Sequence, residues 1–129
     1  KECSNKRPDV FFELEKHCVI VEVDENQHKS YAESCECARI NEIVNSIGGK
    51  SVIIIRFNPD KTYNTFDAKK TEIKKDMNYK MEILIKKIKD ELVKEYEIFV
   101  VKIIQLFFDD NYEKYNEIKE ENITDKVAL

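Results

Sequence analysis

The sequence predicts an α/β domain: a small mixed β-sheet in the element order β-β-α-β-α-β, flanked by helices. Short runs rich in β-branched residues alternate with two longer stretches of helical periodicity. The length of 129 residues suits one domain of ordinary size. Only 2 glycines and 2 prolines are present, which argues against a loop-rich sandwich and against a Gly-rich phosphate-binding loop.

The first two predicted strands form an antiparallel hairpin. Residues 9–14 follow Pro8, which suits a strand start because proline cannot donate a ladder hydrogen bond. A short polar turn separates them from residues 18–24, which are mostly β-branched. After a polar loop, residues 33–47 place their isoleucines and a valine at helical spacing, and Gly48-Gly49 should end this helix.

The rest of the chain predicts two strands around a long helix. Residues 51–57 are nearly all apolar, which is typical of a central strand buried on both faces. A polar loop then leads to a helix over residues 68–95. Residues 98–108 predict the last strand, although periodicity alone leaves a continued helix open. We expect the domain to span residues 1–110, and residues 111–129 to be an acidic tail that is mobile or a short helix. The predicted apolar stripe of the long helix comprises Ile73, Met77, Met81, Leu84, Ile85, Ile88 and Leu92.

The charge is unevenly distributed. The formal net charge of −4 taken alone counts against a nucleic-acid partner. However, residues 1–60 carry 8 basic and 11 acidic side chains, residues 61–96 carry 10 and 7, and residues 97–129 carry 4 and 8. This pattern is compatible with one basic surface plus a cluster of functional carboxylates. No apolar run approaches the roughly 20 residues of a bilayer-spanning helix, so no membrane partner is expected.

The four cysteines lack the paired spacing of a zinc ribbon. Cys18 lies in an apolar run, where a buried free thiol is the usual state. We therefore expect an intracellular, reducing environment and no disulfides. Cys3, Cys35 and Cys37 could join a histidine around zinc, and this alternative stays open.

Carboxylates gather at one end of the predicted hairpin. Glu22 and Asp24 lie two residues apart in a strand otherwise made of Val and Ile, so they share one face. Asp9 begins the partner strand and can reach the same end. Converging carboxylates suit Mg²⁺ or Mn²⁺, which can clamp a phosphodiester and lower the pKa of a bound water. Alternatively, Glu22 and Asp24 line the solvated face of an edge hairpin.

Other polar residues follow these carboxylates. His28 could act as a general base toward the attacking water, although a surface histidine is the plain alternative. Arg39, on the first helix, could orient a carboxylate or contact a phosphate. Arg56 ends the central strand and needs a partner, most simply a strand carboxylate or a phosphate, unless it is solvated. Asn58 follows it and should emerge at the same edge of the sheet.

Several basic residues are candidate contacts to a DNA backbone, with solvated surface charge as the alternative for each. They are Lys6, Arg7, Lys69, Lys70, Lys74 and Lys75.

The order of these residues resembles the PD-(D/E)xK nuclease superfamily, and is most similar to the branch of the very-short-patch-repair (Vsr) endonucleases and Vsr-like homing endonucleases. The matching residues are Asp9, the run Glu22-Val23-Asp24-Glu25-Asn26-Gln27-His28, Arg39, and Ile55-Arg56-Phe57-Asn58-Pro59. Within this branch, the segment from Arg7 to Asp60 and Gln105-Leu106-Phe107-Phe108-Asp109 are similar to uncharacterised endonuclease-like proteins of large DNA viruses. The resemblance is specific over about residues 3–60.

This resemblance implies a restriction-endonuclease-like core and a metal-dependent endonuclease that hydrolyses DNA. Asp9 and Glu22 would bind Mg²⁺ or Mn²⁺, helped by the Val23 carbonyl and by Asp24. His28 would activate water in place of a lysine. Two further residues would assist: Arg56 as a phosphate or carboxylate partner, and Asn58 beside the site. Gln27 joins the predicted DNA contacts. A viral source would place the protein in the cytoplasm or nucleus of an infected cell.

The sequence also departs from the superfamily. Asp24 occupies the position of the catalytic lysine, so a lysine-based mechanism is not expected. The acid that related enzymes supply from a preceding helix has no counterpart, which is compatible with a missing N-terminal segment, a partner or a homodimer. The alternative function is therefore a catalytically weak or inactive nuclease-fold module for DNA binding or assembly.

Overall fold

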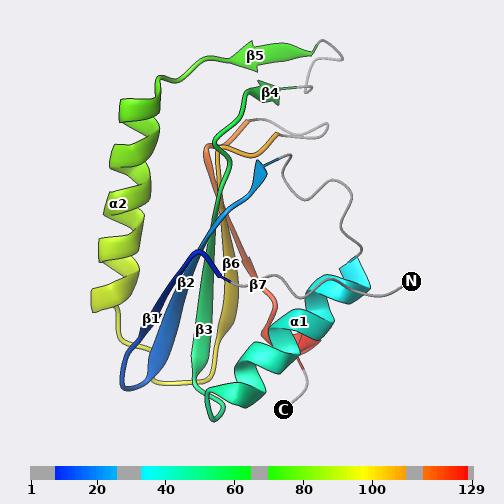
Figure 1. Ribbon diagram of the computed structural model, residues 1–129, viewed down its shortest axis with the longest axis vertical. Helices are drawn as coiled ribbons and strands as arrows, with labels where there is room; N and C mark the ends of the chain where they lie inside the picture. Colours follow the sequence, from blue (N-terminus) through cyan, green and yellow to red (C-terminus); the bar gives the residue numbers. More distant parts are fainter. Residues whose placement is uncertain (1–7, 26–32, 65–69, 110–114, 128–129) are drawn as a thin grey trace.

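The computed structural model describes residues 8–25, 33–64, 70–109 and 115–127 (Figure 1). Its strands are β1 (Val10–Glu13), β2 (His17–Val23), β3 (Ser51–Phe57), β4 (Thr62–Asn64), β5 (Thr71–Ile73), β6 (Val101–Leu106) and β7 (Ile118–Asn122). Its helices are α1 (Glu33–Ser46), α2 (Met77–Val93) and the 3-10 helix η2 (Thr124–Lys126).

A five-stranded mixed sheet in the order β1-β2-β3-β6-β7 forms the centre of the fold. Strands β2, β3 and β6 run parallel, whereas β1 and β7 pair antiparallel at the two edges. Helices α1 and α2 lie on opposite faces of this sheet, and the β4–β5 pair lies beyond one of its ends (Figure 1). The predicted α/β class, the hairpin and the fully buried central strand are confirmed.

Helix α1 ends as the sequence predicts. Gly48 and Gly49 follow it with φ angles of 76° and 79°, in the left-handed region that glycine adopts at little cost. The Gly49 N–H donates to the Val44 carbonyl at 3.1 Å, which satisfies one of the last carbonyls of the helix.

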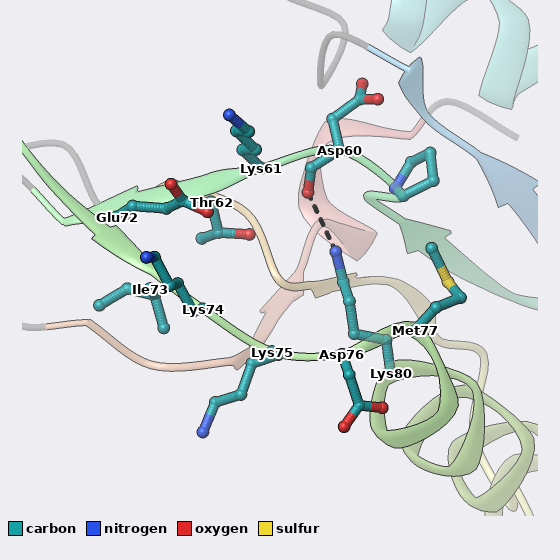
Figure 2. Close-up of a pocket in the computed structure, with 11 residues that line it drawn as sticks. Asp60, Lys61, Thr62, Glu72, Ile73, Lys74, Lys75, Asp76, Met77 and Lys80 are labelled. Atoms are coloured by element: carbon teal, nitrogen blue, oxygen red, sulfur yellow. Dashed lines mark hydrogen bonds between the residues drawn. The ribbon is translucent and has the colours of Figure 1, made fainter.

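Helix α2 is shorter than predicted. It begins at Met77, directly after Asp76 (Figure 2). Asp76 caps the helix by accepting a hydrogen bond from the Tyr79 N–H at 2.9 Å. Residues 71–73 form β5 instead of helix, and they pair with β4 in a segment that we predicted as a loop. Strands of three residues are too short to show an alternating pattern, so the sequence signal of the neighbouring helix extended over them.

The buried face of α2 also differs from the predicted stripe. Met77 and Ile85, both assigned to that stripe, are 48% and 45% exposed. Lys80 and Glu91 are buried instead, together with Leu84. Each of the two charged side chains has a hydrogen-bond partner inside the protein, which removes most of the cost of its burial.

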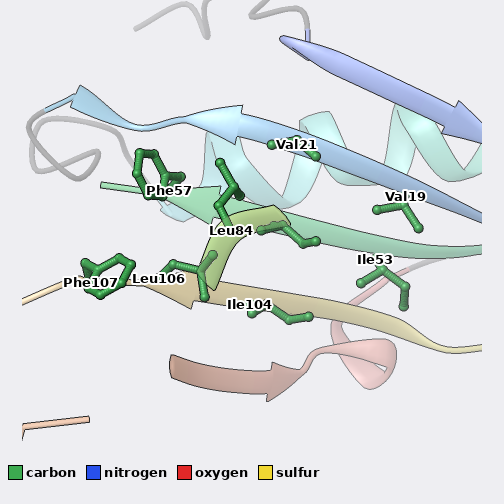
Figure 3. Close-up of a cluster of buried hydrophobic side chains, with 9 residues drawn as sticks. Val19, Val21, Ile53, Phe57, Leu84, Ile104, Leu106 and Phe107 are labelled. Atoms are coloured by element: carbon green, nitrogen blue, oxygen red, sulfur yellow. The ribbon is translucent and has the colours of Figure 1, made fainter. Parts of the chain in front are cut away.

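Two layers of apolar side chains fill the space between the sheet and its helices. Odd-numbered residues of β2 and β3 face α2, where the core includes Val19, Val21, Ile53, Phe57, Leu84 and Phe107 (Figure 3). Even-numbered residues face α1, where it includes Ile20, Ile40, Val44, Ile54 and Ile123. Because side chains alternate along a strand, the even positions 22 and 56 also lie on the α1 face.

The segment after Asp109 was predicted to be mobile or a short helix. Its described part does hold a short 3-10 helix, Thr124–Lys126, but it also holds a strand that the prediction missed. Residues 118–122 form β7, which pairs with β6 along its whole length. The sequence of β7, Ile-Lys-Glu-Glu-Asn, is charged, as is typical of protected edge strands, so hydrophobicity does not reveal it. In the described part of the chain, no helix is long and apolar enough to cross a membrane.

Candidate functional site

Strands β2 and β3 bring the candidate residues together at their carboxyl ends. Their register places Glu22 opposite Arg56, and the next pair places Arg56 opposite Gln105 on β6. These positions lie on the α1 face of the sheet, and α1 covers them with Glu36 and Arg39. Parallel strands therefore assemble this polar cluster from segments that are far apart in the sequence.

Glu22 is the centre of the cluster. It is completely buried, and its two oxygens accept hydrogen bonds from Arg39 at 2.7 and 2.8 Å. The Arg56 Nε lies 3.5 Å from Glu22 Oε1. A buried carboxylate is tolerated only with such charged partners. The alternative in which Glu22 lines a solvated face is wrong, and Arg39 orients a carboxylate as the sequence suggested.

Asp24 and Glu36 add two more carboxylates. Asp24 is completely buried, and its Oδ2 lies 3.7 Å from the Arg56 Nε. Glu36 contacts the Arg56 guanidinium and lies 3.5 Å from Arg39 Nη2. The cluster thus holds three carboxylates against two guanidiniums.

Sequence reasoning missed Glu36. It precedes Arg39 by three residues, a spacing that places both side chains on one face of a helix, and this signal could have found it.

Asp9 lies at the same end of the hairpin but at the surface. Its Oδ2 accepts a hydrogen bond from the Val23 N–H at 2.7 Å, and its own N–H donates to the Val21 carbonyl at 3.2 Å. The side chain thereby extends the β1–β2 ladder by one hydrogen bond. This contact fixes the Asp9 carboxylate beside the segment that carries Glu22 and Asp24.

The chemistry of these groups suits a hard divalent cation, because the donors are carboxylate oxygens and a carbonyl. The Glu22 oxygens, however, are both bonded to Arg39. Among the residues that the structure describes, no three His, Cys, Asp or Glu side chains are grouped as a metal site. A cation that uses Glu22 would have to displace Arg39 from it.

Asn58 is held in the turn that follows β3. Its Nδ2 donates to the Phe107 carbonyl at 2.8 Å, and its Oδ1 accepts from the Asp60 N–H at 2.9 Å. Thr62 Oγ1 donates to the same Phe107 carbonyl at 2.6 Å. Phe107 has a φ of 65°, which is strained for a residue with a side chain. The described contacts therefore give Asn58 a structural task, which is to hold this turn.

Of the predicted DNA contacts that the structure describes, Lys70, Lys74 and Lys75 are exposed, whereas Arg39 is buried against Glu22. Lys74 and Lys75 lie between β5 and α2, and Lys70 precedes β5. The Lys70 Nζ lies 4.4 Å from the centre of the Tyr63 ring. The other predicted site residues lie outside the described part of the chain: Lys6, Arg7, Gln27, His28 and Lys69.

The structure describes the side chains of two of the four cysteines, Cys18 and Cys37. Cys18 is free and buried, and burial raises the pKa of its thiol. Cys37 is also free. Cys3 lies outside the described residues, as does the side chain of Cys35, so the zinc alternative stays a prediction.

Comparison with known proteins adds no family to this description. The resemblance to the PD-(D/E)xK nucleases therefore stays a prediction that rests on the motifs of the chain itself. No protein-family model matches the sequence, and no curated protein or solved structure is significantly similar to it.

Proposed function

We propose that this chain is a metal-dependent DNA endonuclease domain that hydrolyses phosphodiester bonds. The observation that carries the proposal is the 2.7 Å hydrogen bond from the Val23 N–H to Asp9 Oδ2. It holds one carboxylate at the strand end where Glu22 and Asp24 supply two more. Hard-oxygen donors of this kind, beside a buried Arg56, suit metal-dependent hydrolysis of a phosphodiester.

Each residue has a defined role in this proposal. Asp9 and Glu22 would hold Mg²⁺ or Mn²⁺, with Asp24 and the Val23 carbonyl as further donors. The cation, when bound, would supply Lewis-acid activation of the phosphate and of a water molecule. The Arg56 guanidinium would stabilise negative charge on the phosphate oxygens. His28, outside the described residues, would accept the proton of the attacking water.

A second candidate is a nuclease-fold module that binds DNA or assembles without cleaving it. The Glu22–Arg39 ion pair favours this candidate, because both carboxylate oxygens are already bonded. In the endonuclease, Arg39 must release Glu22. In the non-catalytic module, the pair stays closed and stabilises the fold.

Cleavage of supercoiled plasmid with Mg²⁺ or Mn²⁺ separates the two candidates. We expect nicking by the unmodified chain and at least a roughly 100-fold loss in Asp9→Asn, which keeps an oxygen to accept from Val23 but removes the charge. Asp9→Ala should be at least as inactive. Glu13→Ala is the matched control, because Glu13 lies on the same strand and pairs with Lys50 at the surface. DNA binding that is equal with EDTA, without any nicking, would establish the non-catalytic module.

A further inference from the structure

A cavity of about 390 Å³ lies between the start of α2, β5 and the turn after β3 (Figure 2). Asp60 and Thr62 line it from the turn and from β4, and Glu72 and Lys74 line it from the side of β5. Lys80 reaches into it from α2 and points toward the Asp60 backbone (Figure 2). This cavity is separate from the buried carboxylate cluster, which lies on the α1 face of the sheet.

Lys80 is a buried ammonium group with few partners. Its side chain is 5% exposed, and its Nζ donates to the Asp60 carbonyl at 3.0 Å. The same Nζ lies 5.1 Å from the ring centre of Phe107 and 5.7 Å from that of Phe57. Burial lowers its pKa, and the charge of Asp60 opposes this shift. An ammonium group has three N–H donors, so Lys80 can still donate to a ligand.

The mouth of the cavity carries further positive charge. Lys61, Lys74 and Lys75 line it, and Figure 2 shows Lys61 and Lys75 directed outward on opposite sides. Three acids also line the cavity, Asp60, Glu72 and Asp76. The side chain of Asp76 caps α2. Long lysine side chains on a rim can turn toward an anion that is bound between them.

We propose that the cavity around Lys80 is a phosphate-binding site. A phosphate accepts several charge-assisted hydrogen bonds at once, so its oxygens can bond Lys80 and the rim lysines together. An apolar ligand would leave the buried ammonium with the one hydrogen bond that it makes among the described residues, and a cation would be repelled by it. The phosphate can belong to a nucleic-acid backbone or to a small molecule, since both present the same group.

The cavity and the carboxylate cluster both lie next to the end of β3. Arg56 and Phe57 are neighbours at the end of β3, but Arg56 faces the carboxylate cluster and Phe57 lies beneath Lys80. The cavity and the carboxylate cluster therefore lie on opposite faces of the sheet, at the same end of β3. The phosphate site itself does not depend on whether the chain cleaves DNA.

The test is a titration of the full chain with inorganic phosphate, a single-stranded oligonucleotide and a duplex, followed by NMR of the Lys80 ammonium and nearby amides. We expect Lys80→Met to weaken binding at least about tenfold, and Lys80→Arg to restore part of it. Lys86→Met is the control, because Lys86 lies on the exposed face of the same helix and pairs with Asp90. Equal binding by Lys80→Met and Lys86→Met overturns the proposal.

A second variant covers the case in which Lys80→Met fails to fold. Glu72→Gln removes a carboxylate from the cavity and should tighten phosphate binding by about threefold. Unchanged or weaker binding in this variant counts against the site.

The ligands distinguish the source of the phosphate. A response to inorganic phosphate indicates a small-molecule site, a response to oligonucleotides alone indicates a backbone phosphate, and no response to either overturns the proposal. If phosphate binds at Lys80 but the chain does not cleave DNA, only the endonuclease proposal is overturned. If the chain cleaves DNA but phosphate does not bind at Lys80, only the phosphate site is overturned.

Discussion

Glu22 and Arg39 form a buried ion pair in the candidate site, joined by two hydrogen bonds of 2.7 and 2.8 Å. Removing one partner of such a pair leaves an uncompensated charge inside the protein. We therefore expect Arg39→Met to lower the free energy of unfolding by about 3 kcal/mol, measured by urea denaturation.

The double variant Glu22→Gln/Arg39→Met is the control for this prediction, because it removes both charges. It should lose less stability than the sum of the two single variants. If the losses are simply additive, the pair does not act as a unit and the structural role assigned to it is wrong.

At the level of single residues, the sequence predicted the ion-pair partners of Arg56 better than it predicted the contacts of Asn58. An arginine in an apolar strand must find a partner, so Arg56 could be paired with the strand carboxylates in advance, and the structure confirms this. The spacing of Glu36 to Arg39 marks it as a residue on the same helix face, but its contact with Arg56 depends on tertiary packing. Asn58 was taken as a site residue, but its amide holds the Phe107 carbonyl, a contact between residues 49 positions apart.

A second buried polar network fastens the end of α2 to the sheet. Glu91 accepts hydrogen bonds from Tyr96 and Lys102, and the His17 Nε2 donates to the Glu91 carbonyl at 2.8 Å. Burial and the hydrogen bond to Glu91 raise the pKa of Tyr96 to about 12. Burial alone would lower the pKa of Lys102, but its contacts with Tyr96 and Glu91 raise it overall.

These shifts predict how stability depends on alkaline pH. The folded chain holds the Tyr96 proton more tightly than the unfolded chain, so this stabilisation is complete below pH 10 and is lost as pH rises toward about 12. The raised pKa of Lys102 acts in the same direction. Urea denaturation between pH 9 and 12 should show this decline.

The matched variant for this prediction is Tyr96→Phe, which keeps the ring and removes the hydroxyl. It should be less stable at neutral pH and should show a shallower decline above pH 10. In a pH titration followed by absorbance at 295 nm, the variant should lack the tyrosine ionisation near pH 12 that the unmodified chain shows. An identical pH dependence in both proteins would show that Tyr96 does not titrate with the fold.

At the level of elements, strands with strong apolar signals were predictable and weakly marked ones were not. β2 and β3 each contain a continuous run of β-branched residues, 19–21 and 52–55, and the burial of these runs follows directly from this. β5 is three residues long, and β7 is mostly charged, so neither has a pattern that distinguishes it from helix or tail. Both segments form strands because they pair with a neighbouring strand, β4 or β6. A short window of sequence around either segment does not contain this information.

For the whole molecule, the parallel arrangement of β2, β3 and β6 directs all three carboxyl ends to one edge of the sheet. The carboxylate cluster, the turn of Asn58 and the Lys80 cavity all lie there. Ligand sites of open α/β sheets commonly occupy this edge, because the strand ends leave polar loops there. The positions of Glu22 and Arg56 in the sequence predicted that a site lies at this edge. They did not predict the Lys80 cavity, which lies on the α2 face of the sheet.

The sequence predicted that the domain ends at residue 110, but β7 lies beyond that residue and belongs to the sheet. β7 covers the edge of β6, from the Lys102–Asn122 pair to the Leu106–Ile118 pair, and Ile123 is 5% exposed in the α1-side core. A chain that ends at residue 110 would expose an apolar strand edge and lose this packing. We expect it to lose its cooperative thermal transition and to aggregate, whereas Glu121→Ala, at an exposed position, should melt like the full chain. If the shortened chain melts cooperatively at the same temperature, residues 111–129 are a dispensable tail, and the sheet is complete without its fifth strand.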